Sequence, residues 1–320
     1  MNTLLSLSSM LFVTLGSYLT LGLLRHLGDW SQRRKAQCVV LAAPLVSLAI
    51  GIGSLCLRGM APWDSLLSVA LPLTMGLIAL GALVLGIVRL ALMAQIVARR
   101  GGIADPALQA RVDDLAKQLG SARPRILLCL YDRPLAVTCG LWRPVILLST
   151  WMTKHLDERE LEAVLAHELE HVARHDYFIT WAATVLRDAF FYLPTTWTAY
   201  RQLQQEKELA CDDEVVGATH RPLTLASALT KVWLHALNEP AFEQFSAAQS
   251  LVGVEKTIDD RIKRLLTPHE PPAHTYHAPA VILRMSIAAL VTFLLPGVVN
   301  AILMLILMGC GPALLLGKLF

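Results

Sequence analysis

Residues 166–171 read Ala-His-Glu-Leu-Glu-His, and this stretch predicts a helix that carries a metal site. His167 and His171 are four positions apart, so on a helix their side chains share one face and can bind one ion. Glu168 lies between them, where it can act as a general base on an attacking water molecule. Asp157, three positions before a glutamate, resembles a capping box and predicts the start of the helix. The alternative is a surface helix with two incidental histidines.

A catalytic zinc ion usually has three protein ligands and one open position, so two histidines leave the predicted site incomplete. Residues 206–213 read Glu-Lys-Glu-Leu-Ala-Cys-Asp-Asp and supply acidic candidates. On a helix, Glu208 and Asp212 would share one face, whereas Glu206 would point elsewhere. We expect Glu208 to bind zinc and Asp212 to orient a ligand histidine. The alternative is a solvated acidic helix face.

Three neighbouring residues carry weaker signals. His175 continues the four-residue spacing from His171, but the Arg-His-Asp group around it is typical of a solvated helix end. Asp176 either orients a metal ligand or marks the end of the helix, and the sequence leaves both interpretations open. Cys211 would face away from Glu208, so we expect a buried thiol there and not a ligand.

Two apolar segments upstream of this helix are typical of short buried strands, and they comprise residues 125–130 and 144–148. Between them, residues 135–140 are small and β-prone, which predicts an exposed edge strand. A peptide substrate could add to such an edge through main-chain hydrogen bonds. An ordinary hairpin strand explains the same residues equally well.

The composition indicates a membrane protein. Hydrophobic residues make up 55% of the 320 residues and charged residues 17%, and the mean hydropathy is +0.52. A soluble domain is usually about 45–50% apolar and about 25% charged. Crossing the hydrocarbon core takes about 20 mostly apolar residues. Four runs meet this length, at about residues 4–24, 38–57, 66–88 and 281–308.

The remaining bulk features exclude two classes of function. The net charge of +3 is too small to predict direct binding to nucleic acid. The six cysteines include no Cys-x-x-Cys pair, so neither a disulfide framework nor a cysteine-based zinc knuckle is indicated. We therefore expect the cysteines to be reduced, mostly buried thiols.

Basic residues predict the orientation in the membrane, because short cytoplasmic loops carry an excess of lysine and arginine. The third run ends in Arg99 and Arg100. The segment between the first two runs carries Arg25, Arg33, Arg34 and Lys35. We therefore expect both termini outside the cell and the polar block after Arg99 in the cytoplasm.

The predicted fold is an α-helical membrane protein, with four transmembrane helices and a cytoplasmic α+β zincin-like metalloprotease domain. Three helices are expected in residues 1–98 and the protease domain in residues 99–279. The fourth helix and a short external tail are expected in residues 280–320.

The chain resembles the BlaR/MecR-type membrane metallopeptidases, which are gluzincins. Segment 167–176 resembles the zinc helix of that family, and the string Glu208-Leu-Ala-Cys-Asp212 is the most family-specific match. Segments 140–148 and 258–266 resemble its strand before the zinc helix and its closing helix. Three helices before the domain and one after it also fit.

The resemblance implies one Zn²⁺ ion per chain, with His167, His171 and Glu208 as ligands and Glu168 as the catalytic residue. It also implies a multi-pass protein of the bacterial cytoplasmic membrane, whose domain cleaves itself, a cytoplasmic transcriptional repressor, or both. Antibiotic-sensing members carry an external penicillin-binding domain after the fourth helix, whereas about a dozen residues follow it here. We therefore expect a signal from a membrane sensor partner or through the chain's own helices.

Two other functions are compatible with the same motifs. HtpX-like quality-control proteases share them but typically place membrane spans between them, whereas 36 residues separate His171 and Glu208 here. A non-enzymatic transmembrane transducer would use the zinc domain as a structural module, but a structural site has no use for Glu168.

Overall fold

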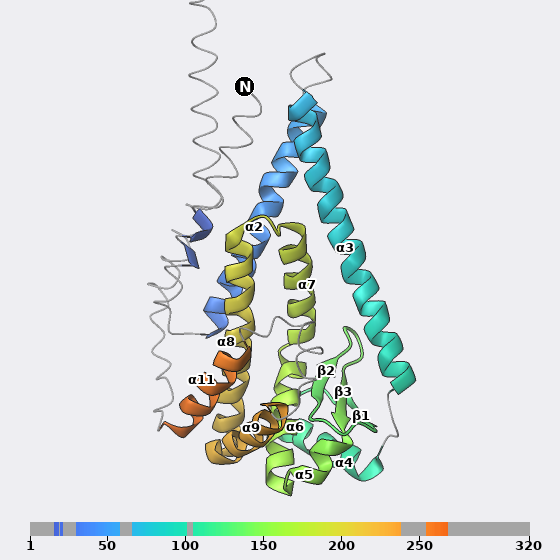
Figure 1. The fold of residues 1–320 in the computed structure, drawn as a ribbon, viewed down its shortest axis with the longest axis vertical. Coiled ribbons are helices and arrows are strands. Elements are labelled where there is room, and N and C mark those ends of the chain that lie inside the picture. Colours follow the sequence, from blue (N-terminus) through green and yellow to red (C-terminus); the bar gives the residue numbers. More distant parts are fainter. Residues whose placement is uncertain are drawn as a thin grey trace, which may run out of the picture. The chain divides into compact units, whose positions relative to one another are not determined.

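The computed structural model describes residues 16–18, 20–21, 30–57, 66–100, 105–237 and 254–267, and Figure 1 shows their fold. The chain divides into two compact units. Among the described residues, one unit comprises 16–18, 20–21, 30–57, 66–85 and 183–203, and the other comprises 86–100, 105–182, 204–237 and 254–267. The predicted span 281–308, the linker before it and most of the predicted span 4–24 lie outside the described residues.

Two long helices match the second and third apolar runs, and they are α2 (Trp30–Leu57) and α3 (Leu66–Arg100). Within the described ranges, residues 73–99 of α3 form the one helix long and apolar enough to cross a membrane. Apolar side chains along it are exposed, and Leu77 is 67% exposed. Arg33, Arg34 and Lys35 are helical and not part of a loop, because arginine and lysine extend helices readily.

A helical hairpin connects the two sequence motifs. Its helices are α7 (Asp176–Ala189) and α8 (Pro194–Thr219). At the turn, Ala189 and Phe190 are buried in one cluster with Ala82 of α3, and Leu48 of α2 packs against it. Residues 183–203 therefore group with α2 and the first part of α3.

The charges near this turn are neutralised within the hairpin. Arg187 Nη2 donates a hydrogen bond to Asp188 Oδ1 at 2.7 Å. The Arg187 guanidinium also lies 5.0 Å from the ring centre of Trp197 and 4.5 Å from that of Tyr200. Such cation–π contacts are stronger where water is excluded. An ion pair can therefore sit within an otherwise aromatic and apolar stretch.

The second unit contains a three-stranded sheet in the order β1-β3-β2 (Figure 1). The strands are β1 (Arg125–Cys129), β2 (Ala136–Cys139) and β3 (Val145–Ser149). β1 pairs with β3 in parallel and β2 pairs with β3 in the antiparallel direction. The three predicted strands are confirmed within a residue or two at their ends. β2 lies at an edge of the sheet and also forms a hairpin with β3, so the two interpretations of residues 135–140 both remain open.

Five helices accompany this sheet: α4 (Pro106–Gln118), α5 (Thr150–His155), α6 (Glu158–Ala173), α9 (Pro222–Leu237) and α11 (Val254–Leu266). Ile126, Ile146 and Leu148 extend from one sheet face into the main core, where they meet Leu165 and Leu169 of α6. The packing places α6 against β2, α9 against α6, and α11 against α9. A buried core thus supports α6 along most of its length.

The start of α6 is fixed by the predicted capping box. Asp157 Oδ1 accepts a hydrogen bond from the Glu160 N–H at 2.8 Å, and Glu160 Oε2 accepts one from the Asp157 N–H at 2.9 Å. The buried Glu160 carboxylate also bonds Ser227 Oγ and Lys231 Nζ of α9, both at 2.6 Å. The residue that begins α6 therefore also joins it to α9.

Candidate metal centre

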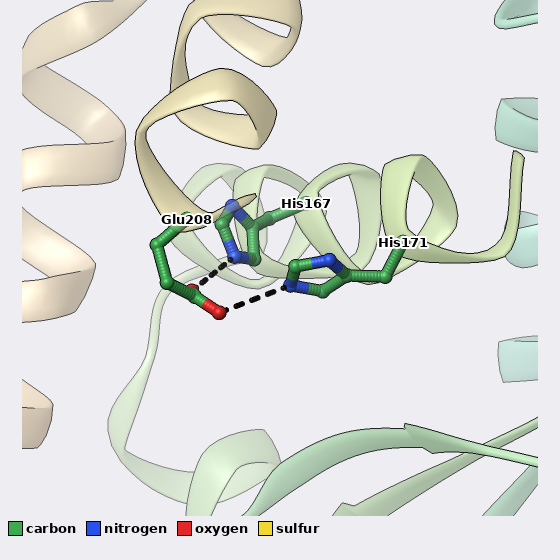
Figure 2. Close-up of side chains that lie close together, drawn as sticks. All are labelled: His167, His171 and Glu208. Carbon is green, nitrogen blue, oxygen red and sulfur yellow. Dashed lines mark hydrogen bonds and ion pairs between the residues drawn. The ribbon is translucent and has the colours of Figure 1, made fainter. Parts of the chain in front are cut away.

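Helices α6 and α8 bring the three predicted ligands together, as Figure 2 shows. Glu208 Oε2 lies 3.3 Å from His167 Nε2, and Glu208 Oε1 lies 3.7 Å from His171 Nε2. One ligand-type atom from each residue lies within 4.8 Å of those of the other two. Two imidazoles and one carboxylate are the donor set of many catalytic zinc sites. The residues therefore fit the metal that the sequence implies.

The opposite nitrogen of each histidine faces a buried carboxylate. His167 Nδ1 is 3.2 Å from Asp212 Oδ1, and His171 Nδ1 is 2.9 Å from Asp176 Oδ2. A carboxylate at Nδ1 fixes the ring orientation and leaves Nε2 available as a ligand. Asp212 thus lies beside His167, and its role in orienting a metal ligand stays a prediction. Asp176 lies likewise beside the other histidine and also begins α7.

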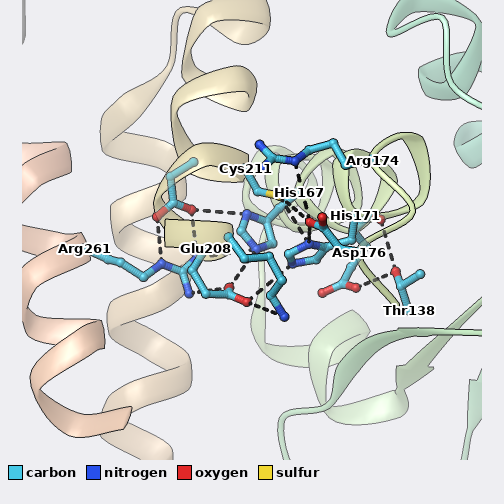
Figure 3. Close-up of polar contacts among 11 residues, drawn as sticks. Thr138, His167, His171, Arg174, Asp176, Glu208, Cys211 and Arg261 are labelled. Carbon is cyan, nitrogen blue, oxygen red and sulfur yellow. Dashed lines mark hydrogen bonds and ion pairs between the residues drawn. The ribbon is translucent and has the colours of Figure 1, made fainter. Parts of the chain in front are cut away.

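Three basic side chains neutralise this acidic group (Figure 3). Arg261 of α11 is buried and donates two hydrogen bonds to Asp212, both at 2.7 Å. Its Nη1 also donates to Glu208 Oε2 at 3.1 Å. Lys207 Nζ lies 3.1 Å from Glu208 Oε1, and Arg174 Nε lies 3.7 Å from Asp176 Oδ2. Asp212, Glu208 and Asp176 therefore each have a cationic partner.

These contacts shift the pKa values of the site. Burial lowers the pKa of His167, but Asp212 and Glu208 raise it more, to about 9. Burial raises the pKa of Glu208, but Lys207 and the two histidines hold it well below its usual range. In the metal-free site, His167 is therefore protonated and Glu208 is ionised. A metal ion would take the place of the His167 proton, as metal binding to imidazole generally requires.

Glu168 lies one residue after His167 and is itself buried. Its carboxylate Oε2 accepts a hydrogen bond from Thr138 Oγ1 of β2 at 2.7 Å. Thr138 Oγ1 is also 3.1 Å from the main-chain oxygen of Glu168. The predicted general base thus lies between α6 and the strand β2.

The structure distinguishes the two weaker ligand candidates, His175 and Cys211. His175 is exposed, has a φ of 55° and lies between α6 and α7, away from the ligand group. Cys211 is fully buried, and its Sγ lies 3.2 Å from His171 Nδ1. With His171 and Asp176 it forms a second group of ligand-type atoms. Burial and the nearby Asp176 raise the pKa of this thiol, however, and metals bind the thiolate.

Sequence reasoning missed Arg261, Lys207 and Thr138 as parts of the site. Lys207 precedes Glu208 directly, and a cation beside a buried carboxylate was a signal that could have been used. Arg261 lies within the closing-helix segment that was singled out, but its role was not. Thr138 lies in the predicted edge strand, and nothing in its spacing points to Glu168.

Comparison with known proteins places the chain in a peptidase family. The family model described as BlaR1 peptidase M56 matches residues 65–265, so the chain belongs to that family. The match includes both halves of the ligand group and Arg261.

The chain is similar to regulatory proteins and to proteases. It is 25% identical over 132 residues to the methicillin resistance mecR1 protein of Staphylococcus aureus, covering 41% of this chain and 22% of that protein. It is 28% identical over 162 residues to protease HtpX homolog 1 of Streptomyces coelicolor, covering 40% and 53%. It is 29% identical over 89 residues to regulatory protein BlaR1 of Bacillus licheniformis, covering 28% and 15%. The matched regions thus span less than two thirds of each of these relatives.

Proposed function

We propose that this chain is a membrane-embedded, zinc-dependent endopeptidase of the gluzincin type. The observation that carries the proposal is the convergence of His167 Nε2, His171 Nε2 and the Glu208 carboxylate, with a buried carboxylate behind each histidine. His167, His171 and Glu208 hold one zinc ion, and Asp212 orients His167. Bound zinc supplies Lewis acidity, which polarises the scissile carbonyl and makes water more acidic, to a pKa of about 7.

Glu168 is the general base in this proposal. It takes a proton from the attacking water while the water oxygen bonds to the carbonyl carbon, and it passes that proton to the leaving amine as the C–N bond breaks. The open edge of β2 is the binding site for the peptide, which pairs with it as an additional strand.

The proposed arrangement has residues 99–279 largely in the cytoplasm and four transmembrane helices, with the N-terminus outside. We assign the chain to regulated proteolysis, in which it cleaves itself or a repressor after a signal from a membrane partner. The resemblance to BlaR1, whose name describes a regulatory protein, supports this role.

A quality-control protease is the second candidate, and one observation favours it. The α7–α8 turn packs with α2 and α3, so a helical hairpin does reach the apolar helices between the two motifs. The short spacing between His171 and Glu208 therefore does not exclude the arrangement expected for HtpX-like proteases. Similarity to protease HtpX homolog 1 supports the same role.

The test begins with the purified full-length chain in detergent. Metal analysis should give one zinc per chain for the wild type and for Glu168→Gln, and Glu208→Ala should lose most of it. Glu168→Gln should lose cleavage of unfolded proteins, because it cannot accept the proton from water. Cleavage by Glu168→Gln at the wild-type rate would refute the mechanism and leave a structural zinc module.

A second experiment separates the two roles. Membranes from cells with wild-type chain and with Glu168→Ala are compared by quantitative proteomics. One accumulating protein with one defined cut indicates regulated proteolysis, whereas many accumulating unfolded membrane proteins indicate quality control.

A further inference from the structure

The side chain of Thr138 is hydrogen-bonded to the carboxylate of Glu168. Its hydroxyl donates to Glu168 Oε2 at 2.7 Å, the length of a strong bond to a charged oxygen. No other side-chain hydrogen bond to that carboxylate occurs among the residues that the structure describes. Oε2 accepts this bond, whereas Oε1 accepts no hydrogen bond from a described residue and is free to face the attacking water. Figure 3 shows Thr138 on the strand side of the site.

The main chain of Thr138 faces the open edge of the sheet. Ser149 N donates to Leu135 O at 2.8 Å, so this pair in the β2–β3 ladder is hydrogen-bonded. In an antiparallel ladder, hydrogen-bonded and non-hydrogen-bonded pairs alternate along the strand. Thr138 opposite Ile146 is three steps further along and is therefore a non-hydrogen-bonded pair. Its N–H and C=O consequently point away from β3, and no strand lies beyond β2 in the described sheet.

One residue therefore connects the strand edge with the general base. We propose that Thr138 is a positioning residue, which couples the pairing of a peptide with β2 to the orientation of the Glu168 carboxylate. This inference rests on the proposed peptidase function and on peptide binding at β2. A peptide strand paired with the main chain of Thr138 fixes that residue, and its hydroxyl then holds Glu168 with Oε1 directed to the attacking water. Geometry at this step affects the rate strongly, because small displacements of a catalytic group are costly.

The experiment uses two substitutions at Thr138. Thr138→Val keeps the shape and β propensity of the side chain but removes the hydroxyl. Thr138→Ser keeps the hydroxyl and removes a methyl group. Thr230→Val is the matched control, because Thr230 Oγ1 donates to the Ala226 carbonyl of its own helix α9, at 2.7 Å. Each purified full-length variant is assayed for zinc content and for kcat and KM on a quenched-fluorescent peptide.

We expect Thr138→Val to lower kcat by about 10- to 100-fold, since a misplaced catalytic group can cost about 100-fold in rate. Its KM and zinc content should stay at wild-type values, because neither the strand edge nor the ligands change. Thr138→Ser should recover most of the lost kcat, and Thr230→Val should behave as wild type.

The cleavage rate of Glu168→Gln serves as the background rate. It distinguishes a failure of the proposed function from a failure of the inference about Thr138. A wild-type chain that is no faster than this background overturns the proposed function and the inference with it. An active wild type with an equally active Thr138→Val overturns the inference alone. The same conclusion follows if Thr138→Ser is as slow as Thr138→Val, or if the loss appears in KM or zinc content instead of kcat.

Discussion

The Nδ1 atom of each histidine in the candidate site lies beside an aspartate carboxylate, and the two aspartates come from different helices. Asp212 lies on α8 and Asp176 begins α7. Both are nearly fully buried. Burial raises the pKa of each, but His171 holds the pKa of Asp176 below its usual range, and Arg261 together with His167 does the same for Asp212. Ionised aspartates make the imidazoles better ligands, so these residues should affect metal affinity without touching the metal.

We predict that Asp176→Asn and Asp212→Asn each weaken zinc binding by about 10- to 100-fold, the usual effect of losing such a partner. Competition with a chromophoric chelator measures the Kd. Asp213→Asn is the control, because Asp213 pairs with Arg264. Wild-type affinity in both substituted chains would mean that the aspartates do not orient the ligands.

Gly140 makes the turn that leads from β2 to β3. Its φ is +98°, and a Cβ atom there would lie 2.3 Å from the Arg143 carbonyl oxygen. We predict that Gly140→Ala lowers the free energy of unfolding by about 1–3 kcal/mol, the cost of a strained backbone. Gly217→Ala in α8 is the control, since a Cβ atom at Gly217 meets nothing within 4 Å. Thermal unfolding in detergent compares them, and equal midpoints would contradict the assigned strain.

At the scale of elements, α11 joins the site through Arg261. This side chain is 8% exposed and its partner Asp212 is 3% exposed, so the pair is buried. Arg264, one turn later, pairs with Asp213 while both remain partly exposed. Removing one partner of a buried pair leaves an unpaired charge, whereas losing a partly exposed pair costs little.

We therefore predict that Arg261→Gln destabilises the docking of α11 by about 3–5 kcal/mol. The matched change Arg264→Gln should cost about 0–1 kcal/mol. Hydrogen exchange of the α11 amides reports the free energy of local opening directly. Equal losses of protection in the two variants would show that Arg261 contributes no more than an ordinary surface contact.

The contact that Glu160 makes between α6 and α9 should depend on pH. Burial raises the pKa of Glu160, but Lys231, Ser227 and the Asp157 N–H lower it more, to below its ordinary value of 4.5. A group with a lowered folded pKa stabilises the fold above its unfolded pKa, and this contribution is lost as the pH falls through the folded pKa.

We predict that the stability difference between metal-free wild type and Glu160→Gln is constant above about pH 4.5 and shrinks at lower pH. Urea unfolding at several pH values measures it. The exposed Glu162 on the same helix provides the control, and Glu162→Gln should show little effect at any pH. A difference that does not change with pH would mean that the charge on Glu160 is not what joins the helices.

Sequence periodicity could predict the ligand group because four-residue spacing places side chains on one helix face. His167, His171, Glu208 and Asp212 all follow from that rule. Asp176 could not be resolved, since the path of the chain after α6 decides whether it turns back to His171. Arg261 lies 49 positions beyond Asp212, and an arginine in an amphipathic helix reads as a surface residue. Such contacts depend on tertiary packing, which a local pattern does not contain.

At the scale of the whole molecule, the second motif is linked to the apolar helices. α8 begins in the unit that contains α2 and carries Glu208 in the other unit. Within the polar block, residues 183–203 belong to the unit that contains α2. Apolar and aromatic residues at that turn pack with α2 and α3, which net charge and run length could not reveal.

The last prediction concerns the orientation of the chain in the membrane. Basic residues lie at the start of α2, at Arg33, Arg34 and Lys35, and at the end of α3, at Arg99 and Arg100. In the proposed topology α2 and α3 both cross the membrane, which places the start of α2 and the end of α3 on the same side. Because both ends are basic, each independently favours the cytoplasmic side, where lysine and arginine are retained. The segment between α2 and α3 should then be external.

Reporter fusions after residues 62 and 160 test this orientation. Alkaline phosphatase, which is active only outside the cytoplasm, should be active at residue 62 and inactive at residue 160, and a cytoplasmic fluorescent reporter should give the reverse. Replacing Arg99 and Arg100 by glutamine removes one of the two basic ends and should increase the inverted fraction without abolishing insertion. An external reporter at residue 160 in the wild-type chain would overturn the topology. A cytoplasmic repressor could then not be the substrate, because it would never meet Glu168.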